Sequence, residues 1–252
     1  MTAPEASPKA MILAAGLGTR LRPLTNDRPK ALVTVAGRTL LDLTLARLRS
    51  VGVHQVIVNT HHYADLIADY LRANHNFGME IEISPEAELL DTGGGLKQAA
   101  HFFTGSDRPF LVHNVDIAST IDLAAMLRFH TEHGALATLA VQRRTTSRYL
   151  LFDQGQLCGR RAALDGPPEL VRPAAEPEAL AFAGIHVLSP SIFHHMPEQG
   201  AFSIIPAYLR LAAEGHSIQA FPADSAYWRD LGKPESIQQA ALDLASGTFI
   251  AG

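Results

Sequence analysis

Short apolar runs alternate with amphipathic helical patterns up to residue 141, and this alternation constrains the fold more than any other feature. The apolar runs predict strands at residues 10–15, 55–59, 109–114 and 136–141, and the alternation of polar and apolar residues predicts another at 80–84. Helical spacing predicts helices at residues 39–51, 63–73, 94–103 and 121–133. Repeated strand–helix–strand units indicate an α/β fold with a Rossmann-like mixed, mainly parallel sheet flanked by helices. Ligands of such sheets bind outside the carboxyl ends of the strands, so functional residues are sought there.

The pattern changes in the second half of the chain. Residues 148–161 predict a hairpin around Asp153-Gln154-Gly155, and the proline-bearing stretch 163–179 predicts a loop. Strands follow at 182–188 and 217–222, and helices at 204–214 and 236–245. We expect a disordered lead-in at residues 1–8 and a single domain over residues 9–252, in which 144–200 form a subregion and lid.

Composition excludes several classes of protein. The chain has 252 residues, 47% of them hydrophobic and 18% charged, which suits a globular fold with a sizeable core. A net charge of −4 argues against nucleic-acid binding, which favours a basic face. No apolar run approaches the roughly 20 residues of a membrane helix. The polar start at 1–8 is no secretory signal, and the single Cys158 cannot form an internal disulfide, so we expect a cytoplasmic protein.

The loop after the first predicted strand carries the strongest functional signal. Gly16 and Gly18 allow backbone N–H groups to approach an anion closely. Four cations follow, and they supply countercharge for phosphate oxygens: Arg20, Arg22, Arg28 and Lys30. The spacing matches no P-loop, and Leu21 stands where a dinucleotide fingerprint needs its third glycine. The loop therefore indicates a compact polyanion such as a nucleoside triphosphate, the alternative being an ordinary solvated loop.

The run Gly16-x-Gly18-Thr19-Arg20-Leu21-x-Pro23-Leu24-Thr25, followed by Pro29-Lys30, resembles the signature of sugar-1-phosphate nucleotidyltransferases. The resemblance implies the nucleotide-diphospho-sugar transferase type of fold. It also implies catalytic roles for two cations, with Arg20 stabilising the triphosphate and Lys30 contacting phosphate. The residues implied to bind the nucleotide in this loop are Ala14, Ala15, Gly16, Gly18 and Thr19.

Two carboxylates far apart in the sequence are candidates for a metal site. Asp116 follows a predicted strand, and Asp230 lies in Trp228-Arg229-Asp230-Leu231-Gly232. Carboxylates beside a triphosphate suit Mg²⁺, whereas the alternatives are a helix N-cap for Asp116 and a turn residue for Asp230. The resemblance implies that both ligate the metal and that Asp116 is catalytic. Val115 departs from the family pattern, in which many members have glycine before the metal aspartate.

A second glycine cluster lies at 84–95 and predicts the base and sugar pockets. The resemblance implies that Pro85, Glu86, Thr92, Gly93 and Gly94 line the nucleobase and ribose. Within the family, Ser84-Pro85-Glu86 and the three glycines look most like N-acetylmuramate-1-phosphate uridylyltransferases, and mannose-1-phosphate guanylyltransferases have similar loops.

The sugar is expected at strand ends on the same side. The residues implied to contact it are Asn59, Asn114 and Gly184, with Phe182 in the same strand as Gly184. On this interpretation residues 144–200 form the acceptor side. Arg148 opens the predicted hairpin, and we favour a solvated strand residue over a ligand of the sugar phosphate. The 12 histidines include His130 and His133 at helical spacing, but no cysteine or acid completes a zinc motif.

These features predict an Mg²⁺-dependent enzyme that transfers a nucleotidyl group from a nucleoside triphosphate, UTP by the resemblance, to a sugar 1-phosphate. The products would be a nucleoside-diphosphate sugar and pyrophosphate, and N-acetylmuramate 1-phosphate as acceptor would place the enzyme in cell-wall recycling. Alternatives are mannose-1-phosphate guanylyl transfer, phosphocholine cytidylyl transfer, and a non-enzymatic nucleotide-sugar sensor. The expected partners are the two substrates, with no nucleic acid and no membrane, and a homodimer is an open expectation.

Overall fold

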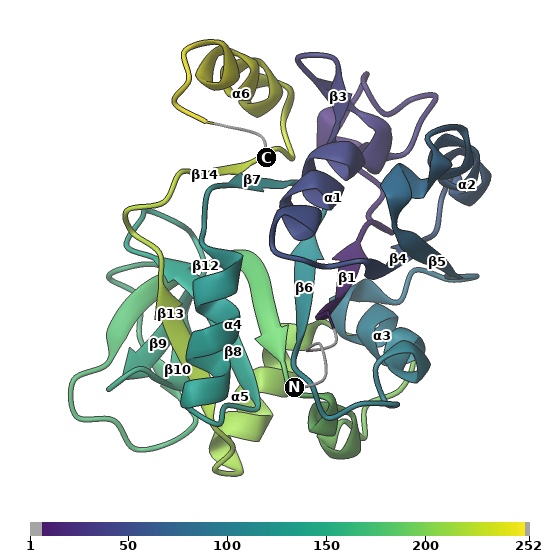
Figure 1. Ribbon diagram of the computed structural model, residues 1–252. Coiled ribbons are helices and arrows are strands. Elements are labelled where there is room, and N and C mark those ends of the chain that lie inside the picture. Colours follow the sequence, from purple (N-terminus) through teal and green to yellow (C-terminus); the bar gives the residue numbers. More distant parts are fainter. Residues whose placement is uncertain (1–6, 250–252) are drawn as a thin grey trace, which may run out of the picture.

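The computed structural model describes residues 7–249, so the first six residues of the predicted lead-in at 1–8 lie outside the described part. Figure 1 shows a central sheet with helices on both faces. Within residues 7–249 the sheet has ten strands in the order β11-β10-β13-β8-β12-β6-β1-β4-β5, with β9 beside β10 and β12. The predicted α/β fold with a mixed sheet is confirmed.

The first half of the sheet is parallel, as predicted. Its strands are β1 (Lys9–Leu13), β4 (Gln55–Thr60), β5 (Glu80–Pro85) and β6 (Phe110–Asn114). They are connected through α1 (Leu40–Ser50), α2 (Ala64–Ala73) and α3 (Asp91–Gln98). β1 pairs in parallel with both β4 and β6, and β4 with β5, so the carboxyl ends of all four strands lie at one edge of the sheet.

The second half of the sheet is mixed. Its strands are β8 (Ala137–Gln142), β9 (Tyr149–Asp153), β10 (Gln156–Arg161), β11 (Glu169–Leu170), β12 (Glu178–Leu188) and β13 (Ile218–Pro222). β12 is antiparallel to both β6 and β8, while β8 and β13 are parallel. β8 therefore runs in the same direction as β6, and both strands end at the same edge of the sheet. Residues 144–200 contribute four strands to this shared sheet, and their role as a lid stays a prediction.

Two hydrophobic cores lie on opposite faces of the sheet. One packs under α1, α2, α4 (Leu123–Glu132) and α6 (Pro234–Ala245), and the other under α3 and α5 (Ile204–Ala213). Leu41, Leu45 and Leu48 lie on one face of α1, and each is at most 1% exposed. Burying one such leucine contributes about 2 kcal/mol. Thr39 begins α1 because its hydroxyl accepts the Asp42 N–H at 3.0 Å.

Several short elements were not predicted from the sequence patterns. β2 (Thr34–Val35) pairs with β3 (Arg38–Thr39), and β7 (Ile117–Ser119) pairs with β14 (Trp228–Asp230). 3₁₀ turns occur at η1 (Thr19–Leu21), η2 (Lys30–Leu32), η3 (His75–Gly78), η4 (Ala99–Phe102) and η5 (Pro190–His195). The predicted helix at 94–103 is α3 followed by η4, and the predicted loop at 163–179 contains β11 and the first residues of β12. Between residues 7 and 249, no helix is both long and apolar enough to cross a membrane.

Candidate active site

A two-stranded sheet brings the two candidate metal carboxylates together. β7 and β14 pair antiparallel, and Asp230 lies opposite Ile117, the residue after Asp116. The Leu231 N–H donates to the Asp116 carbonyl at 2.8 Å, which extends this pairing by one step. Figure 1 shows β7 and β14 beyond the end of β6 and between the two halves of the molecule. Residues 114 positions apart in the chain are thus neighbours at the edge where the parallel strands end.

Each carboxylate has a cation from the loop after β1. Lys30 Nζ donates to Asp116 Oδ2, and the two side chains are only 12% and 17% exposed. Arg20 Nη2 lies 4.0 Å from Asp230 Oδ2, with side chains 60% and 43% exposed. Burial makes the first pair the stronger electrostatic interaction, because solvent screens it less. The exposed second pair is open to an incoming anion.

Gly232 allows this close approach. Its N–H donates to Asp230 Oδ1 at 2.7 Å, which fixes the carboxylate. A Cβ at this position would lie 2.7 Å from both Arg20 Nη2 and Asp230 Oδ1. Any larger residue would therefore force Arg20 and Asp230 to shift.

The glycine loop is held in place at Gly18 and open at Gly16. Gly18 has a φ of +64°, and a Cβ there would lie 3.1 Å from carbons of Lys30 and Thr25. The Thr25 hydroxyl donates to the Gly18 carbonyl at 2.9 Å. A Cβ at Gly16 would meet nothing within 4 Å. Within residues 7–249, no protein acceptor takes the N–H groups of residues 16–18, so this backbone is free to bind an anion.

The donor set at this edge suits a magnesium ion that is shared with substrate. Among residues 7–249, no group of three or more histidine, cysteine, aspartate or glutamate side chains is placed to hold a metal. One carboxylate directly before β7 and one at the end of the neighbouring β14 match the way proteins hold Mg²⁺, which takes one or two carboxylates and completes its shell with waters and phosphate oxygens. Asp116 and Asp230 therefore fit this ion.

Asn59 and Glu86 form an internal brace, and their contacts with sugar and base stay a prediction. They are 3% and 4% exposed. Asn59 Nδ2 donates to Glu86 Oε1 at 2.7 Å, and Asn59 Oδ1 accepts the Ala14 N–H at 2.7 Å. Glu86 Oε2 accepts the Leu90 N–H at 2.9 Å. These protein partners occupy both side chains, so the pair ties β4, the loop after β1 and the start of α3 together.

The α3 glycines pack closely against protein, and their contact with the nucleobase and ribose stays a prediction. A Cβ at Gly93 would lie 2.3 Å from the Phe202 ring, and one at Gly94 would lie 2.4 Å from the Gly200 carbonyl. The N–H groups of both glycines donate to the Phe202 carbonyl at 2.9 and 3.2 Å. The Thr92 hydroxyl accepts the Ile204 N–H at 3.0 Å, at the start of α5. Of the residues predicted to contact the base, Pro85 remains exposed at the end of β5.

Asn114 and Gly184 meet on the acceptor side. Gly184 has a φ of +76°, and a Cβ there would lie 2.9 Å from Asn114 Nδ2. Asn114 Oδ1 is buried and has no hydrogen-bond partner in the described part of the protein. A buried unpaired oxygen is costly, and an unmet acceptor at a strand end is suited to a ligand donor. Arg28, by contrast, is exposed and bonded to Asp27 at 2.9 Å.

Arg144 is a candidate site residue that the sequence patterns did not reveal. It follows β8 by two residues and lies over the Trp228 ring, with its guanidinium carbon 3.6 Å from the ring centre. Arg144 Nη2 donates to the Phe182 carbonyl at 2.8 Å. Burial lowers the pKa of Arg144, and the nearby Asp230 opposes that effect. Its sequence context offered no motif that would have singled it out.

A polar cluster connects α6 to β14. Asp243 Oδ2 accepts the Tyr227 hydroxyl at 2.6 Å and lies 2.9 Å from Arg229 Nη2. Asp243 Oδ1 accepts Gln239 Nε2 at 2.9 Å. Hydrogen bonds, that of Tyr227 foremost, hold the pKa of Asp243 below its usual value. The cluster flanks Asp230 and fixes the strand that presents it.

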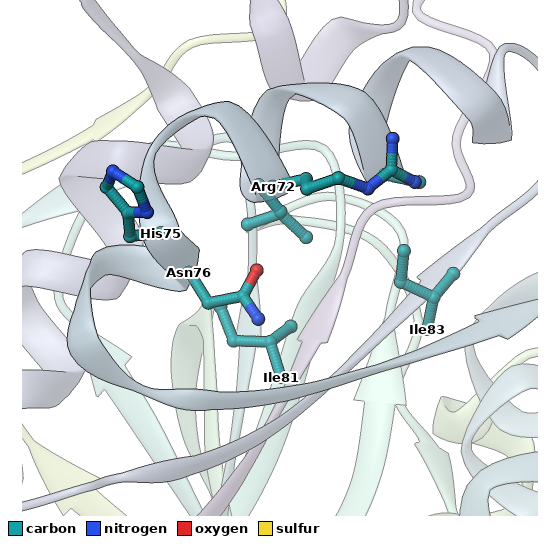
Figure 2. Close-up of a pocket in the computed structure, with 7 residues that line it drawn as sticks. Arg72, His75, Asn76, Ile81 and Ile83 are labelled. Atoms are coloured by element: carbon teal, nitrogen blue, oxygen red, sulfur yellow. The ribbon is translucent and has the colours of Figure 1, made fainter.

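A cavity of about 470 Å³ lies elsewhere, at the edge strand β5. Its lining residues come from α2, η3 and β5: Ala68, Leu71, Arg72, His75, Asn76, Ile81 and Ile83. Figure 2 shows His75 and Asn76 above Ile81, with Arg72 farther along the helix. The lining contains no carboxylate and is three strands away from β6, so the chemistry of this cavity does not match that of the aspartate pair.

Comparisons with known proteins agree with this geometry. The profile of the nucleotidyl transferase family matches residues 9–247. The chain is 38% identical to the N-acetylmuramate alpha-1-phosphate uridylyltransferase of Caulobacter vibrioides, over 94% of this chain and 96% of that protein. It is 30% identical to the UTP–glucose-1-phosphate uridylyltransferase of Synechocystis, over 94% of this chain and 63% of that longer protein. The structure of the inositol-1-phosphate CTP transferase of T. maritima has a TM-score of 0.76, with 18% identity and 96% of both chains covered, which shows a shared fold.

Proposed function

The chain belongs to the nucleotidyl transferase family, and from that premise we propose that it transfers a uridylyl group from UTP to N-acetylmuramate 1-phosphate. The products are the UDP-sugar and pyrophosphate. One observation carries the proposal: the pairing of β7 with β14, which unites Asp116 and Asp230 beside the cations of the glycine loop.

The reaction needs no protein nucleophile. An oxygen of the sugar 1-phosphate attacks the α-phosphorus in line, a phosphorus–oxygen bond forms, and the bond to the departing pyrophosphate breaks. The chain contributes positioning and charge, which are the main sources of catalysis in phosphoryl chemistry. The free backbone N–H groups of residues 16–18 bind the triphosphate, Lys30 holds the reacting phosphates, and Arg20 stabilises the charge on pyrophosphate as it leaves.

Asp116 and Asp230 would hold Mg²⁺, which when bound neutralises phosphate charge and orients the α-phosphoryl group. The buried Lys30 donates a hydrogen bond to the Asp116 carboxylate and fixes its direction. The Gly232 N–H fixes the direction of the Asp230 carboxylate through its hydrogen bond to Oδ1. The two carboxylates are thus preorganised before substrate arrives.

Uridylyl transfer to the muramate sugar is favoured by the relative at 38% identity, because that similarity covers 96% of the relative's length. Phosphocholine is a poor acceptor on physical grounds. Its quaternary ammonium needs open aromatic faces, whereas the Trp228 face is covered by the Arg144 guanidinium at 3.6 Å. Two cations at one ring would repel each other.

Pyrophosphate release tests the proposal. The four nucleoside triphosphates are each paired with N-acetylmuramate 1-phosphate, glucose 1-phosphate, mannose 1-phosphate and phosphocholine, with Mg²⁺ or with EDTA. We expect the highest kcat/KM for UTP with the muramate sugar and none with EDTA. Preference for GTP with mannose 1-phosphate would replace the proposed substrate pair. Binding of a nucleotide sugar without turnover of any pair would overturn enzymatic function and leave a sensor.

The proposed setting follows from the substrates. UTP is a cytoplasmic metabolite, and we propose that the enzyme acts in the cytoplasm, in recycling of cell-wall sugars. The net charge of −4 supports small-molecule substrates over nucleic acid. A homodimer remains a prediction, and size-exclusion chromatography with light scattering would test it.

A further inference from the structure

A nucleotidyl transfer brings two polyanions to one centre, and the cations of the glycine loop serve the nucleotide. We propose that Arg144 binds an anionic group of the acceptor sugar, either its 1-phosphate or a carboxylate it carries. This inference rests on the proposed function, since it concerns the second substrate of the same site. Nothing in the glycine motif or the aspartate pair requires Arg144, so the proposal adds a residue to both.

The topology places Arg144 on the acceptor side of the aspartate pair. It follows β8, whose carboxyl end lies at the same edge as that of β6. β12 separates these two strands, whereas Arg20 and Lys30 come from the chain after β1, on the opposite side of β6. Asp230 interacts electrostatically with Arg144 and lies 4.0 Å from Arg20. Asp230 therefore stands between a guanidinium on the nucleotide side and another on the acceptor side.

Its surroundings fix the guanidinium in one orientation. The plane rests on Trp228 at 3.6 Å, and Arg144 Nη2 donates to the Phe182 carbonyl at 2.8 Å. Trp228 is itself fixed, because its Nε1 donates to the Ala183 carbonyl at 2.8 Å. In the described part of the protein, Arg144 has no carboxylate within salt-bridge distance, and its Nη1 donates to no protein acceptor. A preorganised guanidinium with a free edge suits paired oxygens of phosphate or carboxylate.

The half-buried position of the Arg144 guanidinium costs free energy of desolvation when no ligand is bound. Arg144 Nε is buried and unpaired, and burial lowers the pKa of the group. An anion on the free edge would offset that cost, because charge-assisted hydrogen bonds strengthen where water is excluded. The same edge carries Asn114, whose buried Oδ1 also lacks a partner in the described residues. Arg144 supplies the charge and Asn114 a neutral polar atom for one bound acceptor.

The neighbouring arginine provides a matched control. Arg143 is 60% exposed and already paired with Glu178 at 2.6 Å and Asp224 at 2.5 Å. It has the same charge one residue away, but its guanidinium is occupied. If the local charge alone attracted the acceptor, replacing Arg143 would matter as much as replacing Arg144.

The test compares two acceptors and three variants. N-acetylmuramate 1-phosphate carries a phosphate and a carboxylate, and N-acetylglucosamine 1-phosphate carries the phosphate alone. Arg144→Gln, Arg144→Lys and Arg143→Gln are assayed at saturating UTP and Mg²⁺. We expect Arg144→Gln to raise the acceptor KM roughly tenfold or more, as loss of a charge-assisted pair does, without changing the KM for UTP. Arg144→Lys should recover part of the loss, and Arg143→Gln should stay within about twofold of wild type.

The two acceptors identify the group. A loss confined to N-acetylmuramate 1-phosphate assigns Arg144 to the carboxylate, and an equal loss on both acceptors assigns it to the phosphate. An unchanged acceptor KM in Arg144→Gln, or an effect equal to that of Arg143→Gln, would overturn the proposal. Calorimetric binding of each acceptor in the absence of UTP, with the melting temperature of each variant, gives a readout that does not need turnover. Failure of the wild-type protein to bind or use either acceptor would refute the proposed function instead.

Discussion

At the scale of single residues, the two glycines of the loop after β1 have different reasons to be glycine. Gly18 has a left-handed φ of +64° and is packed against Lys30 and Thr25. Gly16 is exposed and surrounded by open space on the side a Cβ would occupy. The first is required by the fold of the loop, and the second is required only if a ligand fills that space.

Replacing each glycine with alanine should therefore separate stability from binding. We expect Gly18→Ala to lower the free energy of unfolding by about 1–2 kcal/mol, because a left-handed alanine is strained and its methyl group is crowded. Gly16→Ala should leave stability within about 0.5 kcal/mol and weaken UTP binding severalfold. Urea unfolding and calorimetric titration with UTP measure the two effects. Equal UTP affinity in Gly16→Ala and wild type would contradict a triphosphate at this loop.

Asp116→Asn should abolish most turnover and spare the fold. The amide keeps the shape but loses the charge that would hold Mg²⁺ and that pairs with Lys30. We expect kcat to fall about 100-fold or more, which is typical of removing one preorganised electrostatic group. Asp27→Asn is a control, because Asp27 is exposed and its ion pair within residues 7–249 is with Arg28 at the surface. Near wild-type kcat for Asp116→Asn at saturating Mg²⁺ would exclude this residue from the metal site.

Residue types alone do not reveal what a glycine makes room for. The predicted loop after β1 is present, because backbone freedom is a local property of the sequence, and its binding of a triphosphate stays a prediction. Gly93 and Gly94 carry the same local signal, yet they admit Phe202 and Gly200 from a segment over 100 residues later. Asn59 in β4 similarly donates a hydrogen bond to Glu86, the residue after the neighbouring strand β5. Such pairings depend on tertiary packing, which a single sequence does not encode by spacing.

At the scale of elements, α6 determines where the second carboxylate lies. Asp243 on α6 binds Tyr227 and Arg229, the residues that flank Trp228 just before Asp230. We expect Asp243→Asn to raise the Mg²⁺ concentration for half-maximal activity severalfold, with a smaller change in kcat at saturating Mg²⁺. A merely structural helix contact would lower the melting temperature without changing this requirement.

The control for that prediction lies on the same helix. Glu235 is exposed in the first turn of α6, and Glu235→Gln should leave the Mg²⁺ requirement unchanged. Titration of activity with Mg²⁺, together with thermal unfolding of each variant, distinguishes the outcomes. If Asp243→Asn shows the Mg²⁺ dependence of wild type, then α6 does not position Asp230.

The long elements were predictable, but those that assemble the site were not. All five strands predicted before residue 142 appear, because buried parallel strands form continuous apolar runs and the edge strand β5 alternates between polar and apolar residues. β7 and β14 have only three residues each, too few to show a period of two. The convergence of Asp116 and Asp230 was therefore implied by the family resemblance and not by spacing. Arg144 lies beyond a strand end with no motif around it, so only the three-dimensional structure associates it with the site.

At the scale of the whole molecule, three buried histidines predict acid sensitivity. Burial lowers the pKa of His113 and His130 to about 4 and that of His186 to about 3, from an ordinary value of 6.5. They lie on β6, α4 and β12, so both halves of the sheet are involved. All three are neutral in the folded protein near neutral pH.

The direction of the pH dependence of stability follows from these lowered pKa values. Above pH 6.5 these histidines are neutral in both states and stability does not depend on them. As pH falls from 6.5 towards 4, the unfolded chain binds protons that the folded protein excludes, so stability is lost. The unfolded chain then binds up to three more protons than the folded protein. The free energy of unfolding therefore falls by about 4 kcal/mol per pH unit, since one proton corresponds to about 1.4 kcal/mol. Integrated from pH 6.5 to 4, the loss is roughly 9 kcal/mol, so a domain at the lower end of the usual stability range of about 5–15 kcal/mol would unfold before reaching pH 4.

Urea unfolding at several pH values between 7 and 5 measures this slope. Removing one buried histidine should reduce it by one proton, and His130→Gln is the suitable change because Gln keeps a polar group near Thr138 and Ser189, the partners of the His130 ring. His54→Gln alters an exposed histidine and should leave the slope as it is. A wild-type slope below one proton would mean that these histidines become protonated within the folded protein. The sheet would then tolerate charge between β6 and β12, contrary to the complete burial of both rings.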